Sequence, residues 1–180
     1  MKRCKWVNLN NPLYVKYHDD EWCVPNYDDG YLFEMLLLES FQAGLSWECV
    51  LNKRKNFKKA FDGFDYNKIS NYDDKKIEKL KNNSGIIRNK LKIKSAINNA
   101  KVFIDIQKQF GSFSNYIWGF TNNRILYNVN KTSNELSDLI SSDLKKRGMS
   151  FVGTTIIYSY LQAIGIINDH EKECDFYKEV

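Results

Sequence analysis

The chain has little that would interrupt a helix and no apolar run long enough to cross a membrane. Its 180 residues include only 2 prolines, and proline is the residue that breaks helices most strongly. No segment approaches the roughly 18 consecutive apolar residues of a membrane-spanning helix, and the start, MKRCKWVNLN, lacks the apolar core of a signal peptide. These absences argue against a membrane or secreted protein. We therefore expect a soluble, cytoplasmic protein with no membrane partner.

Cysteine and histidine are also scarce. The 4 cysteines argue against a disulfide framework in an intracellular chain and leave metal binding, reactive thiols or burial. Cys4 and Cys174 combine with the only two histidines, His18 and His170, into a Cys2His2 set of the kind that binds structural zinc. The two pairs lie at opposite ends of the chain, so a zinc site would clasp the two ends together. Spacing leaves a second interpretation open, in which these are surface histidines and unrelated thiols.

Composition predicts one domain with basic clusters. A hydrophobic content of 43% supplies one sizeable core, so we expect residues 1–180 to form a single domain. A monomer is expected as well, although composition does not bear on this. The net charge is +5, and basic residues gather in segments 53–59, 88–94 and 145–147. Such clusters suit a polyanion such as DNA. Solvated helix faces would have the same composition and remain the alternative.

The hydrophobic pattern predicts an all-α fold. Apolar residues recur at helical spacing along most of the chain, and strict alternation is rare. Capping residues predict helix starts at 28–29, near Ser46, at 73–74 and after Thr132, where Glu135 has capping-box spacing. The last of these helices should stop at Gly148. Segment 122–131 fits either a loop or a short extended pair.

The segment KKRGMSFVGTT has the pattern of a helix, a short turn and a second helix. Its turn contains Gly148 and Gly153, and the second helix opens on Thr154. Backbone N–H groups at a helix start attract phosphate, and Lys146 adds positive charge beside them. The pattern therefore suits contact with a DNA backbone. It would equally suit a tight helical hairpin whose glycines only permit close packing.

Aromatic residues and one acid form a third candidate site. Trp6, Tyr14 and Tyr17 lie in an irregular N-terminal arm, and Glu39 and Trp47 follow. Flat aromatic rings suit a base flipped out of DNA, and a positively charged base in particular, because the ring face is negative. A carboxylate could accept hydrogen bonds from the amine of such a base. Against this, aromatic residues usually lie in cores, and Glu39 would then be exposed at a helix end.

Four blocks of sequence resemble the 3-methyladenine DNA glycosylase I family, which is similar to the helix-hairpin-helix repair glycosylases. The blocks read RCKWVNLNNPLYVKYHDDEW, LLLESFQAGLSWECVLNKR, GIIRNKLKIKSAINNA and LKKRGMSFVGTTIIYSYLQAIGIINDH, the last followed by Cys174. They lie in the family's order and cover well over half the chain. Two positions depart from the usual pattern, Cys23 in place of glycine and Phe41 in place of glutamine, and Cys23 could confuse the zinc ligand set.

The resemblance implies a role for each matched residue. The compact helical domain would carry a helix-hairpin-helix element at MSFVGTT and a structural Zn²⁺ that joins its N- and C-terminal segments. The implied metal ligands are Cys4, His18, His170 and Cys174. The implied base pocket consists of Trp6, Tyr14, Tyr17, Glu39 and Trp47. Gly44 and Leu45 match the loop that fills the gap left by the flipped nucleotide.

The activity implied is excision of 3-methyladenine from double-stranded DNA that contains alkylated adenine, with the free base as product. Glu39 would be the catalytic residue. Residues 153–160 contain no lysine that could form a Schiff base, so we expect a monofunctional enzyme that hydrolyses the bond and does not cleave the strand.

Two other classes of protein remain open at this stage. A zinc-stabilised DNA-binding module without catalysis would explain the basic clusters and the hairpin, but not an acid placed among aromatic residues. A helical interaction protein would use its aromatic residues only as core. In that case Trp47 would be fully buried, with no cavity beside it.

Overall fold

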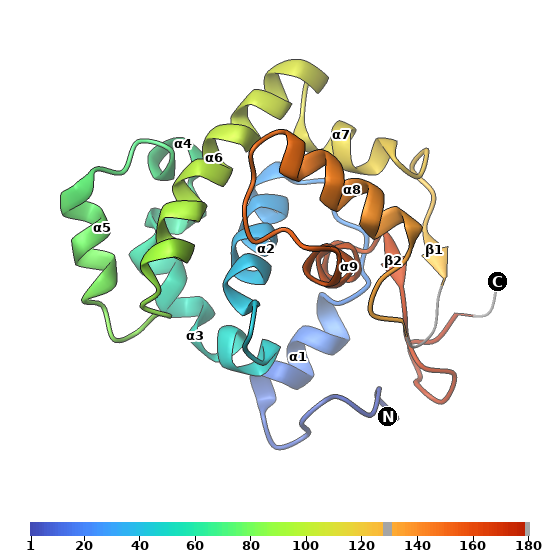
Figure 1. Ribbon diagram of the computed structural model, residues 1–180. Coiled ribbons are helices and arrows are strands. Elements are labelled where there is room, and N and C mark those ends of the chain that lie inside the picture. The colour runs from blue at the N-terminus through green and yellow to red at the C-terminus, as the bar shows by residue number, and fades with distance from the viewer. Residues whose placement is uncertain (128–130, 179–180) are drawn as a thin grey trace.

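The computed structural model describes residues 1–127 and 131–178, and the chain is predominantly helical (Figure 1). The described elements are, in order, α1 (Pro12–Asp20), α2 (Asp29–Gln42), α3 (Trp47–Ala60), the short 3-10 helix η1 (Asp62–Phe64), α4 (Tyr66–Ile69), α5 (Asp74–Lys81), α6 (Lys90–Phe110), α7 (Phe113–Gly119), β1 (Leu126–Tyr127), α8 (Glu135–Lys146), α9 (Thr154–Ala163) and β2 (Ile167–Asn168). Helices make up nearly all of the regular structure, as the hydrophobic periodicity predicts.

Local capping sets where most helices begin. The side chain of Asp28 accepts a hydrogen bond from the backbone N–H of Tyr31 at the start of α2. Ser46 caps α3 and Asp73 caps α5 in the same way. Each cap satisfies one of the backbone donors that a helix start leaves unpaired. These three predicted starts are confirmed.

The predicted start of α8 is wrong. Thr132 does not cap the helix; Asn134 does, by accepting from the backbone N–H of Ser137. The Ser137 hydroxyl accepts in turn from the backbone N–H of Asn134 at 2.9 Å. Asn134 and Ser137 thus form the capping box that the spacing of Thr132 and Glu135 predicted two residues earlier. Asparagine is at least as good a cap as threonine, so the later position can start the helix.

The uncertain segment before α8 contributes one short strand. Leu126 and Tyr127 pair in parallel with Ile167 and Asn168 of β2. The strand is therefore paired with a distant part of the chain. Residues 128–130 of the same segment lie outside the described residues.

The core is built around α2, which contacts α3, α6 and α9. Figure 1 shows these helices around α2. Most of α2 is buried, including Leu32, Phe33, Met35 and Leu36. The helix therefore holds its last turn, where Glu39 lies, at a fixed place inside the molecule.

The two ends of the chain lie beside each other. The backbone N–H of Lys2 donates to Asp175 Oδ2 at 2.9 Å, and the backbone N–H of Asp175 donates to the carbonyl of Lys2 at 3.0 Å. A third contact joins the backbone N–H of Lys5 to Glu171. The N- and C-terminal segments are thus joined, as the zinc hypothesis requires. Among the described helices, none has the length and apolar character that a membrane crossing needs.

Candidate active site and metal centre

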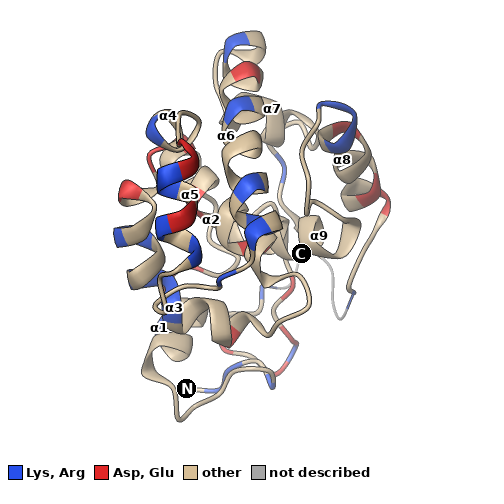
Figure 2. Cartoon of the chain, turned by 60° about the vertical axis from the view of Figure 1, so that its left-hand side comes forward, with Lys and Arg blue, Asp and Glu red and all other residues tan. Residues whose placement is uncertain are grey.

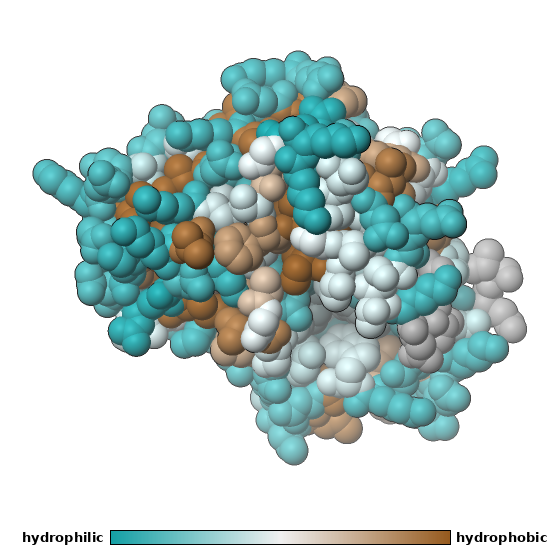
Figure 3. Space-filling view, viewed as in Figure 1, coloured by the Kyte–Doolittle hydropathy of each residue, from teal (hydrophilic) through white to brown (hydrophobic). Residues whose placement is uncertain are grey.

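A cavity of about 190 Å³ opens at the C-terminal end of α2. It is small beside the roughly 300–1,000 Å³ of pockets for drug-sized ligands and suits a ligand the size of one nucleobase. Its lining comes from the N-terminal arm, α1, α2, α3 and α9, and consists of Trp6, Tyr14, Tyr17, Trp22, Glu39, Gln42, Trp47, Ser159 and Gln162. Figure 3 shows this face of the molecule hollowed between α9 and α1. All five residues that the sequence predicts for a base pocket line the same cavity.

Aromatic rings form the walls of the cavity. Trp6 and Tyr14 have ring centroids 5.2 Å apart, and Tyr17 and Trp47 are also 5.2 Å apart. Trp22 packs edge-on against Trp6. Trp47 is only half-buried and borders the cavity, so the alternative in which it belongs solely to the core is wrong. The rings present flat surfaces from more than one side, as a stacked base requires.

Glu39 is a buried acid in the last turn of α2. Only 2% of its surface is exposed, so the alternative that places it in solvent at a helix end is also wrong. Burial raises the pKa of its carboxyl well above the ordinary value. Among the described residues, nothing forms a hydrogen bond with its Oε2 atom. A polar atom left in this state is unusual and calls for a ligand or water.

Two more unpaired polar atoms lie in the cavity lining. Gln42 Oε1 and Trp47 Nε1 are buried and, within the described part of the chain, have no hydrogen-bond partner. Glu39 Oε2 and Gln42 Oε1 can accept hydrogen bonds from a ligand in the cavity, and Trp47 Nε1 can donate one. Gln42, Ser159 and Gln162 were not predicted from the sequence. Gln42 follows Glu39 by three residues, a spacing that places both on one helix face and that could have indicated its role.

The predicted wedge forms the turn between α2 and α3. Gly44 has a φ of +80°, which glycine adopts without strain. The backbone N–H of Leu45 donates to the carbonyl of Gln42 and closes the turn, while the side chain of Leu45 is 42% exposed. The turn lies between Gln42 and Trp47, both of which line the cavity. An apolar side chain therefore stands exposed beside the pocket.

The predicted DNA hairpin connects α8 to α9, which pack against each other. Gly148 ends the first helix with a φ of +100°, and Gly153 precedes the second without a side-chain cap. The hydroxyl of Thr154 lies 2.8 Å from that of Ser137 and forms a hydrogen bond with it. Lys146 is exposed in the last turn of α8. Figure 2 shows lysine and arginine along α6 and at the end of α8 on one side of the molecule.

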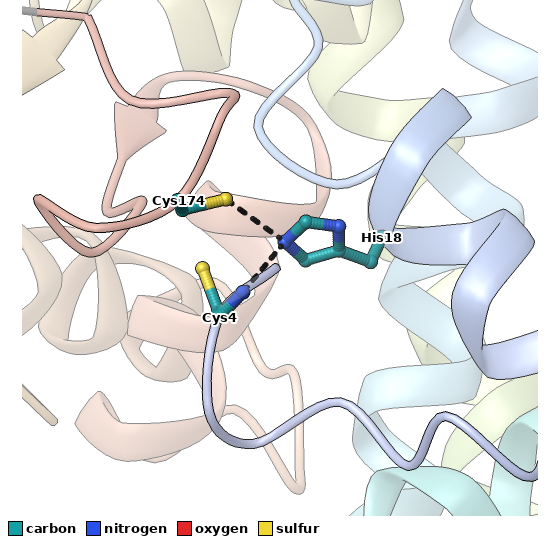
Figure 4. Close-up of side chains that lie close together, drawn as sticks. All are labelled: Cys4, His18 and Cys174. Atoms are coloured by element: carbon teal, nitrogen blue, oxygen red, sulfur yellow. Dashed lines mark hydrogen bonds between the residues drawn. The ribbon is translucent and has the colours of Figure 1, made fainter. Parts of the chain in front are cut away.

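Cys4, His18 and Cys174 come together from the two ends of the chain (Figure 4). Their ligand atoms all lie within 4.8 Å of one another, and the three residues are buried. Asp19 Oδ1 lies 2.8 Å from His18 Nδ1, while His18 Nε2 lies 3.6 Å from the Cys174 sulfur and accepts from the backbone N–H of Cys4 at 3.5 Å. The interpretation that these are surface histidines and unrelated thiols is therefore wrong.

His170 lies next to this group without being part of it. Its ring centroid is 5.2 Å from that of His18, and its Nδ1 atom lies 3.0 Å from Asn168 Oδ1. Its Nε2 atom is buried and unpaired among the described residues. The four candidate donors are two thiols and two imidazole nitrogens, and the Nδ1 atom of each imidazole contacts a neighbouring side chain. Such a donor set suits zinc. Cys23 lies outside the group, and its sulfur accepts from the backbone N–H of Asp169.

Comparison with known proteins assigns the chain to a family. The family model described as methyladenine glycosylase matches residues 6–178. The chain belongs to the methyladenine glycosylase family.

Relatives of this methyladenine glycosylase family member match it over nearly their whole length. DNA-3-methyladenine glycosylase 1 of Escherichia coli (strain K12) is 43% identical over 183 residues, which cover 98% of this chain and 97% of that protein. DNA-3-methyladenine glycosylase of Haemophilus influenzae is 39% identical, with 96% of each chain covered.

Solved structures agree with this assignment. A crystal structure of 3-methyladenine DNA glycosylase I superposes with a TM-score of 0.94 at 42% identity, covering 98% of this chain and all of the other. The Staphylococcus aureus enzyme, whose structure describes 3-methyladenine recognition, gives a TM-score of 0.92 at 31% identity, covering 97% and 96% of the two chains.

Proposed function

We propose that this protein is a DNA glycosylase that excises 3-methyladenine from alkylated double-stranded DNA in base excision repair. The observation that carries the proposal is the cavity in which the unpaired acid of Glu39 is surrounded by Trp6, Tyr17 and Trp47. Family membership and the names of the relatives support it. A variant glycosylase in complex with 3-methyladenine, at 30% identity and a TM-score of 0.92, supports the choice of base.

The rings select the damaged base by its charge. Methylation at N3 makes adenine cationic, and a cation over an aromatic face gains about 0.5–2 kcal/mol. Two pairs of neighbouring rings, Trp47 with Tyr17 and Trp6 with Tyr14, line the cavity. Normal adenine, which is neutral, would lack this gain. Selection therefore takes place when the flipped base enters the cavity.

Glu39 acts on the bound base as its catalytic partner. Its carboxyl oxygen accepts from the exocyclic amine, and the negative charge of its ionised form stabilises the cationic ring in a site with little water. The methylated base then leaves as a neutral molecule, so the reaction needs little acid catalysis. Water captures the cationic sugar, which completes hydrolysis of the N-glycosidic bond. The absence of lysine from residues 153–160 supports a monofunctional enzyme.

The hairpin and the turn before α3 bind the DNA. In this proposal the connection between α8 and α9 is a helix-hairpin-helix element, in which the backbone N–H groups of Gly153 and Thr154, at the start of α9, contact phosphate beside Lys146. Gly44 permits the turn, and Leu45 fills the gap that the flipped nucleotide leaves. Residues 1–180 work as one domain and as a monomer.

A structural zinc ion completes the fold in this proposal. Cys4, His18, His170 and Cys174 hold it, with the unpaired Nε2 atom of His170 as the fourth donor. Bound zinc supplies only cross-linking of the two chain ends, and the reaction does not pass through it. Asp19 contacts Nδ1 of His18, whose Nε2 lies 3.6 Å from the Cys174 sulfur, and Asn168 contacts Nδ1 of His170, which leaves Nε2 of that ring for the metal.

Release of base from methylated DNA tests the proposal directly. Purified protein is incubated with DNA treated with a methylating agent, and the released bases are separated and identified. Wild type should release 3-methyladenine, whereas Glu39→Gln should lower the single-turnover rate by about 100-fold or more. Trp47→Ala should also lower it sharply, with the fold preserved in both variants. Binding of methylated DNA without any release would instead favour the non-catalytic DNA-binding module.

A further inference from the structure

Lys92 is a buried lysine that contacts the end of α2. It lies in the first turn of α6 and is only 7% exposed. Its ammonium donates to the carbonyl oxygens of Phe41 at 2.8 Å and Ala43 at 2.5 Å. None of the ion pairs within the described residues includes Lys92. Burial lowers its pKa, and the ammonium is compensated by backbone carbonyls and not by a carboxylate of the described residues.

These contacts fix the path of the chain after α2. The last carbonyls of a helix lack partners within the helix, and a positive charge is favoured there by the helix dipole. Lys92 satisfies the carbonyls on both sides of Gln42, immediately before Gly44 and Leu45. Lys92 does not line the base cavity. It therefore acts on the position of the turn and not on the base itself.

The same face of α6 also holds the hairpin between α8 and α9. Ser95 Oγ and Asn99 Nδ2 donate to the carbonyl of Ser150 at 3.1 and 2.9 Å, and the backbone N–H of Ser150 donates to Asn99 Oδ1 at 3.0 Å. Positions 92, 95 and 99 follow helical spacing and share one side of the helix. The Lys92 ammonium also lies 5.9 Å from the centre of the Phe151 ring.

We infer that Lys92 is a positioning residue that sets the Gly44–Leu45 turn at a fixed place relative to the 148–153 hairpin. One helix face holds both loops, so the turn can enter the DNA while the hairpin holds the backbone. A wedge displaced by about 1 Å can cost up to 100-fold in rate, because the flipped state then lacks its support. This inference rests on the proposed function, and it assigns to Lys92 a role in reaction on duplex DNA that the base pocket alone does not need.

Comparison of duplex DNA with free base separates positioning from general stability. Lys92→Met removes the ammonium and retains most of the side-chain length. We expect its single-turnover rate on methylated duplex, at saturating enzyme, to fall by about 10- to 100-fold. Binding of free 3-methyladenine, followed by tryptophan fluorescence, should match wild type, since the cavity lining is intact. Lys92→Arg, which can again donate to both carbonyls, should recover most of the rate.

Two further variants keep the test decisive. Lys108→Met removes a lysine from the last turn of the same helix, where its side chain is 72% exposed and paired only with Asp105, and it should react like wild type. Should Lys92→Met fail to fold, Lys92→Gln retains one donor for the carbonyls and replaces it in both measurements.

Three outcomes would contradict the inference. Equal rates for Lys92→Met and wild type would show that the ammonium does not position the turn. Parallel loss of free-base binding and excision would show a general structural role. No release by wild type would overturn the proposed function itself, and the inference with it.

Discussion

At the scale of single residues, the structure buries an acid where water cannot solvate its charge. Glu39 is buried and its pKa is raised by that burial. The folded state therefore holds a proton on this group more tightly than the unfolded chain does. Protonation of Glu39 therefore stabilises the fold relative to the ionised form. This stabilisation is fully present below the pKa of the unfolded chain, near 4.5, and is lost as the pH rises through the higher pKa of the folded protein. A buried acid of this kind weakens the fold at neutral pH.

Glu39→Gln should consequently stabilise the protein while it impairs excision. The glutamine carries no charge to bury, so the melting temperature of the variant should exceed that of wild type at neutral and alkaline pH. The difference should shrink as the pH falls toward and below 4.5, where the wild-type carboxyl becomes protonated in the unfolded as well as the folded state. Thermal melts from pH 4 to pH 8 measure this. If the difference in melting temperature stayed constant from pH 4 to pH 8, the pKa of Glu39 would be the same in the folded and unfolded states, contrary to this prediction.

Gly165 is the position at which a single methyl group should do most damage. Its φ is +78°, and an added Cβ would lie 2.3 Å from Pro25 N and from the carbonyl carbon of Val24. Both neighbours are backbone atoms that cannot move aside. Gly165→Ala should therefore cost about 3 kcal/mol or more, measured by denaturant unfolding. Gly119→Ala, where nothing lies within 4 Å, is the matched control and should be close to neutral.

At the scale of elements, two loops and one helix organise the side proposed to face DNA. The turn after α2 and the hairpin after α8 are far apart in the sequence, yet α6 bonds to both. Helix starts such as Asp28, Ser46 and Asp73 were predictable because a cap acts on residues two or three positions away. The contact between α6 and the loops was not predictable, because it joins residues about 50 positions apart.

Lys146 provides the test at this scale. Removal of one phosphate contact weakens binding to all DNA sequences alike and lowers the slope of log K against log salt by about 1. Lys146→Gln should show both effects in equilibrium binding at several salt concentrations. Lys108→Gln, at the far end of α6 with Asp105 as its partner, should leave the slope unchanged. An unaltered slope for Lys146→Gln would place this lysine away from the DNA.

At the scale of the whole molecule, the two chain ends form one unit. Backbone hydrogen bonds join Lys2 to Asp175, and the buried group of Cys4, His18 and Cys174 lies beside them. A metal at this group would add a cross-link between the N- and C-terminal segments. Such a cross-link stabilises the folded state because binding and folding are coupled.

Cys174→Ser should lower zinc content and thermal stability together. We expect the variant to lose about 3 kcal/mol of unfolding free energy, which corresponds to a fall of roughly 6–12 °C in melting temperature for a chain of this size. Metal analysis by plasma emission and thermal melts of the same preparations measure both. Cys49→Ser, which alters a half-buried thiol in α3 outside the group, should change neither. A metal-free wild-type preparation that melts at the normal temperature would contradict the zinc assignment.

The sequence by itself determined the helical class, the starts of α2, α3 and α5, and five of the nine residues that line the cavity. Periodicity and capping act over a few neighbouring positions, and the four family blocks carry the site residues in order. Only the tertiary structure decided that Glu39 is buried with its Oε2 atom unpaired among the described residues, that Asn134 and not Thr132 caps α8, and that Lys92 bonds to the end of α2 beside the pocket. Burial and hydrogen bonding between distant segments depend on how the helices pack, and that information is not contained in local spacing.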